Sequence, residues 1–235
     1  MINELKIFLT RFRAARWLAN LKNGTLDMLR SGYRPREFWD EWAERFANQA
    51  YQRELHESNL WLLERLRETR PTVVVEVGCG FGRNLKMLRD ELGWPCRLVG
   101  VDISLQLLRK ARQELGPGVP LICGDICRLP FPDKSFRTVV THGVLMHVPP
   151  DSVRCAVREL VRVAAGTLWC IEEQVLTGRG KEGSLSINDY TFAHDYPRLF
   201  GELGIRMPRS DYLGKTVVLS LMRIDRNCVS ANAGS

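Results

Sequence analysis

Residues 73–82 read VVVEVGCGFG, and this stretch decides the fold. A short run of β-branched residues is typical of a buried strand. The three glycines that follow let the chain turn sharply and let a ligand come close to the backbone. The next segment, RNLKMLRDEL (83–92), has the spacing of an amphipathic helix. We therefore expect a strand, a tight turn and a helix, with a ligand bound at the carboxyl end of the strand.

The alternation of strand and helix patterns continues as far as residue 173. Such alternation predicts parallel strands joined by right-handed crossovers, and hence an α/β fold in which helices cover both faces of the sheet, a three-layer sandwich. Ser104 is expected to cap the second of these helices. The further strands are expected at 97–103, 119–126, 135–144 and 167–173, and the further helices at 104–115 and 152–163.

The patterns at the two ends of the chain suggest three parts. Residues 1–70 are expected to form an N-terminal helical segment that covers the main domain, and its second helix has a break near Asn48. The main domain is expected over residues 71–225 and a flexible tail over 226–235. Within the main domain, residues 174–193 lack a period and are rich in Gly and Ser, so we expect a loop or lid there.

Composition excludes several classes of protein. The chain has 235 residues, of which 45% are hydrophobic and 26% charged, as in ordinary globular domains. No apolar run reaches the roughly 18 residues of a membrane-spanning helix, and no secretory signal is evident. The seven cysteines are odd in number and scattered, which favours reduced thiols and a cytoplasmic location. Cys123 and Cys127 lack a second Cys/His pair at zinc spacing, so no metal is expected.

Positive charge is concentrated at the N-terminus. Residues 1–36 hold eight Lys or Arg against two acidic residues, and so carry +6 of the formal +7. A basic segment at one end is a weak indication of nucleic-acid binding, which is stronger when the charge lies over a cleft. The first helix is also amphipathic, which leaves open a membrane surface, its own domain or a second copy in a homodimer as its partner.

Acidic residues near the glycines indicate what the ligand is. A dinucleotide loop of the GxGxxG type would need glycine where this chain has Arg83. Glu76 lies two positions before the first glycine, and a carboxylate there suits a cationic amine better than a pyrophosphate. Asp102 ends the second expected strand, where an acidic side chain accepts hydrogen bonds from ribose hydroxyls. Asp125 follows the third strand and can accept from the exocyclic amine of adenine.

This ordered set of motifs resembles the class I, Rossmann-like S-adenosylmethionine-dependent methyltransferases of the small-molecule type. The resemblance covers about residues 70–223 and rests on EVGCGFG (76–82), VD (101–102), GDI (124–126) and THGVLMHVPP (141–150). It implies a seven-stranded sheet whose last strand is antiparallel. It also implies S-adenosyl-L-methionine as cofactor and S-adenosyl-L-homocysteine as product.

The resemblance further assigns binding roles to individual residues. Asp102 is expected to hold the ribose, with Ile103 packed on the adenine. Asp125 and Ile126 are expected at the adenine edge, and His142 beside the methionyl group. The methionine part is expected to lie on the three glycines of the motif, Gly78, Gly80 and Gly82.

Two histidines are candidates for the catalytic base that an oxygen acceptor needs. His147 is the leading one, because imidazole titrates near neutral pH and this residue follows the fourth strand; the alternative is that it caps the turn after it. His194 is the second candidate, with the alternative that it and Asp195 simply begin a helix. Four aromatic side chains of the N-terminal cover helix either line the binding site for the acceptor or pack the helix on the sheet: Trp39, Trp42, Phe46 and Tyr51.

The sequence therefore predicts methyl transfer to an oxygen or nitrogen of a small-molecule metabolite, such as a sugar or natural-product intermediate. An RNA methyltransferase, a protein or peptide methyltransferase and a non-catalytic cofactor-binding subunit stay open as alternatives. The fourth motif argues against enzymes that methylate exocyclic base amines, which usually carry an Asn/Asp-Pro-Pro-aromatic motif there. Residues 172–173 form a Glu-Glu pair, which we interpret as the end of a strand.

Overall fold

The structure is a computed structural model that describes residues 33–174, 185–188, 190–205 and 218–222. Residues from Pro35 onward form one compact unit, to which the description below refers. The predictions for the basic N-terminal helix, for most of the lid and for the tail fall outside the described residues. None of the helices in the described ranges is long and apolar enough to cross a membrane.

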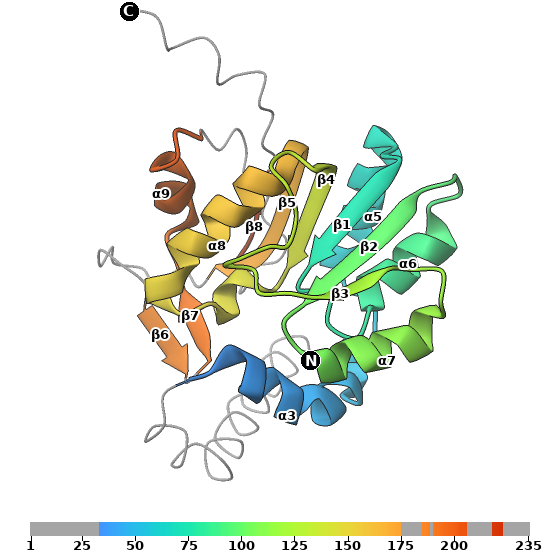
Figure 1. Ribbon diagram of the computed structural model, residues 1–235, viewed down its shortest axis with the longest axis horizontal. Helices are drawn as coiled ribbons and strands as arrows, with labels where there is room; N and C mark the ends of the chain where they lie inside the picture. Colours follow the sequence, from blue (N-terminus) through green and yellow to red (C-terminus); the bar gives the residue numbers. More distant parts are fainter. Residues whose placement is uncertain (1–32, 175–184, 189, 206–217, 223–235) are drawn as a thin grey trace, which may run out of the picture. The chain divides into compact units, whose positions relative to one another are not determined.

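A mostly parallel sheet forms the centre of the unit, with strand order β3-β2-β1-β4-β5-β8 (Figure 1). The five strands β1 to β5 run parallel to their neighbours, and β8 pairs with β5 in the antiparallel direction. The predicted α/β class is thereby confirmed, whereas no seventh strand of this sheet lies within the described residues. The strands are β1 (Val73–Val77), β2 (Arg97–Asp102), β3 (Leu121–Cys123), β4 (Phe136–His142), β5 (Ala164–Gln174) and β8 (Val218–Met222).

Helices flank the sheet on both faces, and the strand order reverses between β1 and β4. Such a reversal opens a crevice at the carboxyl ends of the two strands, which is where ligands bind in open α/β sheets. The helices are α3 (Pro35–Ala47), α4 (Ala50–Arg53), α5 (Glu57–Thr69), α6 (Arg83–Glu91), α7 (Leu105–Leu115), α8 (Pro150–Val163) and α9 (Tyr196–Gly201), with a 3-10 helix η1 (Leu145–His147).

Two apolar cores lie on opposite faces of the sheet, and the strands supply alternate residues to each. In β1, Val75 and Val77 pack in the core that includes α8 and α9, whereas Val74 packs in the core with α5, α6 and α7. In β4, Val139 and Val140 divide between the same two cores. This period of two is the reason that the near-continuous apolar strands are buried on both sides.

Helix α3 is pinned to the start of α7 by a carboxylate. Ser104 caps α7 as predicted, because its hydroxyl oxygen accepts from Leu107 N at 3.1 Å. Asp40 Oδ1 in α3 accepts from the Ser104 hydroxyl at 2.6 Å and from Gln106 N at 3.1 Å. A small apolar cluster that includes Phe81 lies beneath this junction. In Figure 1, α3 lies beside α7 at the edge of the sheet formed by the carboxyl ends of the strands.

The structure differs from the prediction in the region expected to be a lid. Strands β6 (Leu185–Asn188) and β7 (Thr191–Ala193) form an antiparallel pair there, in place of an irregular loop. The predicted break near Asn48 is confirmed, since α3 ends at Ala47 and α4 begins at Ala50.

Candidate functional site

The glycines of the first motif form the turn between β1 and α6. Gly78, Gly80 and Gly82 have φ values of +77°, +55° and +85°, a region that glycine adopts without strain. A β-carbon added at Gly78 would lie 2.3 Å from Val144 Cγ2. At Gly80 the nearest atom to such a carbon would be Phe46 Cε1 at 3.8 Å, so the backbone is open in front of Gly80. A ligand can therefore approach the loop there.

Glu76 is a buried carboxylate with one oxygen unsatisfied. It points from β1 toward α6, where Asn84 Nδ2 donates to Oε1 at 2.6 Å. Its Oε2 is buried and has no hydrogen-bond partner. Burial raises the pKa of Glu76 to about 8, although the Asn84 amide opposes that shift. An unpaired buried acceptor costs free energy, so this atom is suited to a donor that arrives with a ligand.

A chain of hydrogen bonds extends from Glu76 to α5. Asn84 Nδ2 also lies 3.2 Å from His142 Nδ1, and an amide nitrogen can only donate, so Nδ1 accepts. Burial lowers the pKa of His142 to about 3, so the ring is neutral and its proton is on Nε2, which lies 3.0 Å from Ser58 Oγ. Asn59 Nδ2 donates to Asn84 Oδ1 at 2.7 Å. His142 thus lies beside Glu76 at the carboxyl end of β4.

Asp102 connects the glycine turn to the second strand. Its Oδ2 accepts from Gly80 N and its Oδ1 from Ser104 N, both at 2.8 Å. Burial raises the pKa of Asp102 to about 6, against the effect of these two amides. A carboxylate has about four lone-pair directions, so each oxygen can accept one further hydrogen bond. The residue can therefore hold two ligand hydroxyls while it holds the turn.

The loop after β3 brings the second acidic position to the same edge of the sheet. Asp125 Oδ1 accepts from Cys127 N at 2.8 Å, which fixes the orientation of the carboxyl group. Ile126 directly follows Asp125 and Ile103 directly follows Asp102, and both isoleucines are half-buried. Arg36 in α3 donates through Nη1 to Ile103 O at 2.9 Å and to Cys123 Sγ at 3.1 Å. The cover helix therefore reaches the loops that the sequence predicted to surround an adenine.

His147 lies in η1 among aromatic side chains. Its Nδ1 is 2.8 Å from Tyr190 O, and a carbonyl only accepts, so Nδ1 carries the proton. Burial lowers the pKa of His147 to about 4, so the ring is neutral at pH 7 and its unprotonated nitrogen is Nε2. The Trp39 ring packs edge-on at 5.0 Å between centroids, and the Tyr190 ring stacks at 5.8 Å.

The aromatic residues of the cover have two different environments. Phe38 is buried and stacks on Trp42 and on Tyr190, with centroids 5.2 Å and 4.7 Å apart. Together with Trp39 these rings form one cluster around His147. Tyr51 is 50% exposed and stacks on His56 instead, so it lies outside this cluster.

His194 is buried at the start of α9. It is 3% exposed, and its Nε2 lies 3.0 Å from Val148 O. Asp195 caps α9, since its Oδ1 accepts from Arg198 N at 3.0 Å. The alternative considered for Asp195, a helix cap, is therefore confirmed.

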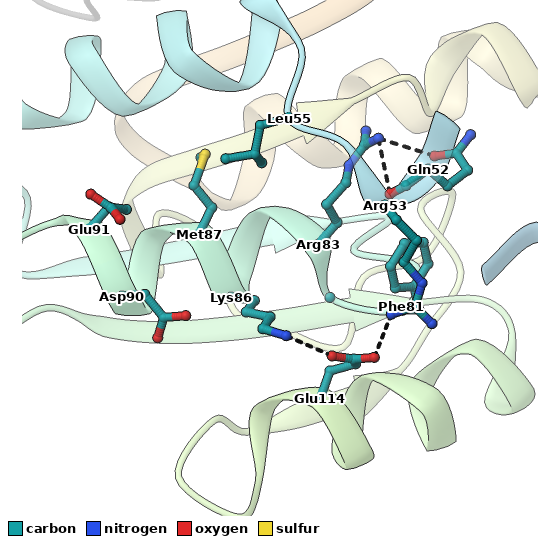
Figure 2. A pocket seen from close by; sticks show the side chains of 11 residues that line it. Gln52, Arg53, Leu55, Phe81, Arg83, Lys86, Met87, Asp90, Glu91 and Glu114 are labelled. Atoms are coloured by element: carbon teal, nitrogen blue, oxygen red, sulfur yellow. Dashed lines mark hydrogen bonds and ion pairs between the residues drawn. The ribbon is translucent and has the colours of Figure 1, made fainter. Parts of the chain in front are cut away.

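A separate cavity of about 260 Å³ lies on the outer side of α6, between α4 and α7 (Figure 2). Lys86 and Arg53 both pair with Glu114, at 2.9 Å and 2.6 Å. Arg83 Nη1 lies 3.2 Å from Gln52 Oε1. Both the lysine and the arginine are therefore paired with Glu114 within the cavity, and neither Asp102 nor Asp125 is among the lining residues. We regard the crevice at the carboxyl ends of β1 and β4 as the candidate site.

Several polar residues of this site were not predicted from the sequence. Asn84, Ser58 and Asn59 complete the hydrogen-bond chain, and Arg36 was counted only as part of the basic segment. One signal is present in the sequence: Asn84 lies in the first turn of an amphipathic helix, directly after the glycines and on the same face as the buried Leu88. Within the described ranges, no three His, Cys, Asp or Glu side chains are grouped so as to hold a metal ion.

The central part of the chain is similar to known methyltransferase sequences. Residues 74–166 match the model of a family described as methyltransferase domain. The demethylmenaquinone methyltransferase of Listeria welshimeri is 33% identical over 116 residues, which is 47% of this chain and 48% of the relative. The alignments with the curated relatives span about half of each relative's length or less.

Solved structures share the fold at low sequence identity. A magnesium protoporphyrin IX methyltransferase from Synechocystis PCC 6803, with bound SAH, has a TM-score of 0.62 at 15% identity, covering 81% of this chain and 97% of that one. A 1,6-didemethyltoxoflavin-N1-methyltransferase from Burkholderia thailandensis has a TM-score of 0.61 at 13% identity, covering 81% and 86%. Both are methyltransferases by name with S-adenosylhomocysteine bound, and the likeness of this chain to them concerns the fold.

Proposed function

Because residues 74–166 match the model of a methyltransferase domain, we propose that this chain is an S-adenosylmethionine-dependent, Rossmann-like methyltransferase that transfers a methyl group from S-adenosyl-L-methionine to an oxygen or nitrogen of a small-molecule metabolite. The observation that carries the proposal is the buried, unpartnered Oε2 of Glu76 close to the open backbone at Gly80. An ammonium group from the methionine part of the cofactor would satisfy that oxygen and favour its charged form.

The other predicted residues fit the remainder of this ligand. Asp102 can accept hydrogen bonds from the ribose hydroxyls in addition to the two amides it already binds. Asp125 and Ile126 would meet the adenine edge, with Ile103 against the ring. His142 has both ring nitrogens engaged by Asn84 and Ser58, so its role would be to position the methionyl end and Glu76. When bound, the cofactor supplies a methyl group that is already strongly electrophilic.

His147 is the leading candidate for a base in this reaction. The carbonyl of Tyr190 holds the proton on Nδ1, so the lone pair for accepting a proton is on Nε2. The lowered pKa keeps the ring neutral throughout the neutral range, so the lone pair on Nε2 is unprotonated there, and the same shift makes this imidazole a weaker base than an ordinary histidine. His194 stays the second candidate, although its burial against Val148 O fits a packing role better. An amine acceptor would need only deprotonation, and the surrounding side chains would then orient it and exclude water.

A small acceptor is supported by two observations. The relatives and neighbours whose names state an acceptor act on small molecules, such as demethylmenaquinone and magnesium protoporphyrin IX. In this chain the Phe38, Trp39 and Tyr190 rings lie around His147, which suits an apolar or flat acceptor. We further propose a seventh strand for the sheet with the last strand antiparallel, as the family resemblance implies, and a cytoplasmic location.

The proposal is tested first by binding of S-adenosyl-L-homocysteine, measured by calorimetry at pH 7. Glu76 has a pKa of about 8 in the free protein and is mostly protonated at pH 7. An incoming ammonium would ionise it, so binding should release up to about one proton, which appears as a dependence of the heat on the buffer. Glu76→Gln should bind more weakly and release none, whereas the exposed Glu64→Gln should behave as the unchanged protein. Absence of binding in the unchanged protein would refute the proposal.

A second experiment identifies the class of acceptor. Methyl transfer from labelled cofactor is followed with a metabolite extract, with RNA and with protein as acceptors. Label in small molecules alone supports the proposal. Label in RNA, with binding that weakens steeply as salt rises, would favour the nucleic-acid alternative through the basic residues 1–36. Label in protein would favour a protein or peptide methyltransferase. Cofactor binding without transfer to any of the three acceptors would favour a non-catalytic cofactor-binding subunit.

A further inference from the structure

Glu172 is a fully buried carboxylate in β5 that the proposed reaction does not use. Its side chain is 0% exposed. Oε1 accepts from Thr141 Oγ1 at 2.9 Å. Oε2 accepts from Val144 N at 3.0 Å and from Met146 N at 3.3 Å. Its hydrogen-bond partners are a hydroxyl group and backbone amides, so this charge is held by dipoles.

The amide donors all belong to the turn that leaves β4. Gly143 has a φ of +65°, and its N donates to Ile171 O at 2.7 Å, which starts the turn beside β5. Val144 and Met146 then point their N–H groups back at Glu172, and Leu145 between them is fully buried. Successive N–H groups that converge in a turn make a concave site for an anion. In this protein the anion is the side chain of a neighbouring strand.

The same turn carries two contacts of the candidate site. The Val144 side chain fills the space in front of Gly78, so a β-carbon on that glycine would collide with it. His147 ends η1, one residue after Met146, and its N donates to Val144 O at 2.9 Å. The position of the His147 ring therefore follows from the position of the turn.

We propose that Glu172 is a positioning residue for the methyl-transfer site: its carboxylate holds the turn at residues 143–147 so that Val144 closes against Gly78 and His147 faces the crevice. This inference rests on the proposed function for the role of His147, and on the hydrogen bonds alone for the turn.

The carboxylate matters because the backbone amides of the turn can only donate, and a charged acceptor binds them more strongly than a neutral one. Glutamine at this position could donate its NH2 to the Thr141 hydroxyl and keep its oxygen toward Val144 N and Met146 N, so both amides would retain an acceptor but with weaker hydrogen bonds. Burial raises the pKa of Glu172 to about 7, while the amides of Val144 and Met146 and the Thr141 hydroxyl act in the opposite direction. The donors of the turn thus favour the charged form that binds them.

Nuclear magnetic resonance of the full chain tests the turn directly. In Glu172→Gln, the amide proton signals of Val144 and Met146 should move upfield. Their hydrogen exchange should become roughly tenfold faster, as expected when the acceptor of a hydrogen bond changes from a charged to a neutral group. The imidazole nitrogen signals of His147 should change as well, because Nδ1 no longer stays aligned with Tyr190 O. Unchanged Val144 and Met146 amides would overturn the proposal.

Two further variants separate positioning from general damage. Thr141→Val keeps the size of the side chain and removes one donor to Glu172. It should change the same amide signals to a smaller extent, and it provides the test if Glu172→Gln does not fold. Glu159→Gln is the matched control, because Glu159 Oε2 accepts from Leu129 N at 2.7 Å in another loop. It should move the Leu129 amide and leave those of Val144 and Met146 unchanged. If Glu172→Gln changes the amide signals of Val144 and Met146 but not the imidazole signals of His147, Glu172 does not position the His147 ring.

A kinetic cycle then connects the turn to the reaction. With the acceptor found in the labelled screen, Glu172→Gln should lower kcat more than it raises the KM for the acceptor. In a His147→Ala background it should lower kcat little further, because the two residues act through one group. Additive losses would overturn the positioning role. If the unchanged protein fails to bind S-adenosyl-L-homocysteine, the proposed function fails, while the amide shifts still decide whether Glu172 holds the turn.

Discussion

Val144 fills the space in front of Gly78, so that a β-carbon added to the glycine would lie 2.3 Å from Val144 Cγ2. The two residues belong to different strand ends, β1 and β4, which meet where the strand order reverses. The close approach therefore packs the turn after β4 directly against the turn after β1. Any side chain at position 78 would therefore collide with Val144, in addition to the backbone strain expected at a φ of +77°.

Gly78→Ala should destabilise the fold more than alanine at another glycine with the same backbone conformation. Gly93 is that control, with a φ of +74° and nothing within 4 Å of an added β-carbon. Gly93→Ala should cost about 1 kcal/mol for the left-handed conformation, and Gly78→Ala roughly 2 kcal/mol more for the collision. Urea denaturation measures both. Val144→Ala should recover part of the loss in Gly78→Ala; no recovery would contradict the proposed collision.

Glu76→Gln should make the ligand-free protein more stable at pH 7. The pKa of Glu76 is raised to about 8 in the fold from 4.5, so the folded state binds more protons between these values. Its stabilising contribution is present below pH 4.5 and is lost as pH rises through 8. Between pH 5 and 7 this amounts to no more than about 3 kcal/mol. Urea denaturation over that range should show a smaller decline for the variant; an identical slope would show that Glu76 titrates normally.

His147→Gln should lower methyl transfer to an oxygen acceptor by about 100-fold, the usual contribution of a positioned base. The glutamine amide can still donate to Tyr190 O, so the local structure should be kept while the base is lost. Because the pKa of His147 is about 4, the rate in the unchanged protein should show no His147 titration between pH 6 and 8. Initial rates over this range provide the measurement. Full activity in His147→Gln would assign the residue a structural role.

Asp40→Ala should loosen the cover helix α3 without unfolding the sheet. It removes the acceptor of the Ser104 hydroxyl and of Gln106 N, at an expected cost of about 1–2 kcal/mol. Limited proteolysis should cut α3 faster in this variant. Glu41→Ala, an exposed neighbour on the same helix, should cleave like the unchanged protein. Equal cleavage in both variants would show that Asp40 does not hold the helix.

The patterns that predicted the fold correctly are local. The strand and helix periods, the Ser104 cap and the break near Asn48 each depend on a few neighbouring residues. The sequence predicts a loop or lid over residues 174–193, and it does not reveal β6 and β7 within that region because these strands are short and are stabilised by pairing with each other. That pairing depends on contacts across the turn, which a single-sequence period does not reveal.

The candidate site divides in the same way. The sequence motifs placed Glu76, Asp102 and Asp125 at strand ends, because the carboxyl ends of parallel strands share one edge of the sheet. The hydrogen-bond chain behind Glu76, in contrast, joins distant segments: Ser58 and His142 are 84 positions apart. Such pairs obey no spacing rule, so the hydrogen-bond chain behind Glu76 could be found only from the coordinates.

The alternation in β1 also sets the chemistry of the crevice. Val74 and Glu76 are two positions apart in β1, so their side chains lie on the same face of the sheet, toward α5 and α6. Asn84 of α6 donates a hydrogen bond to Glu76 on that face. An insertion of one residue before Glu76 would exchange the two faces. The carboxylate would then enter the apolar core beneath α8, and a valine would take its place beside Asn84. The alternation of side chains along this one short strand therefore decides whether a carboxyl group or an apolar side chain lies at the crevice.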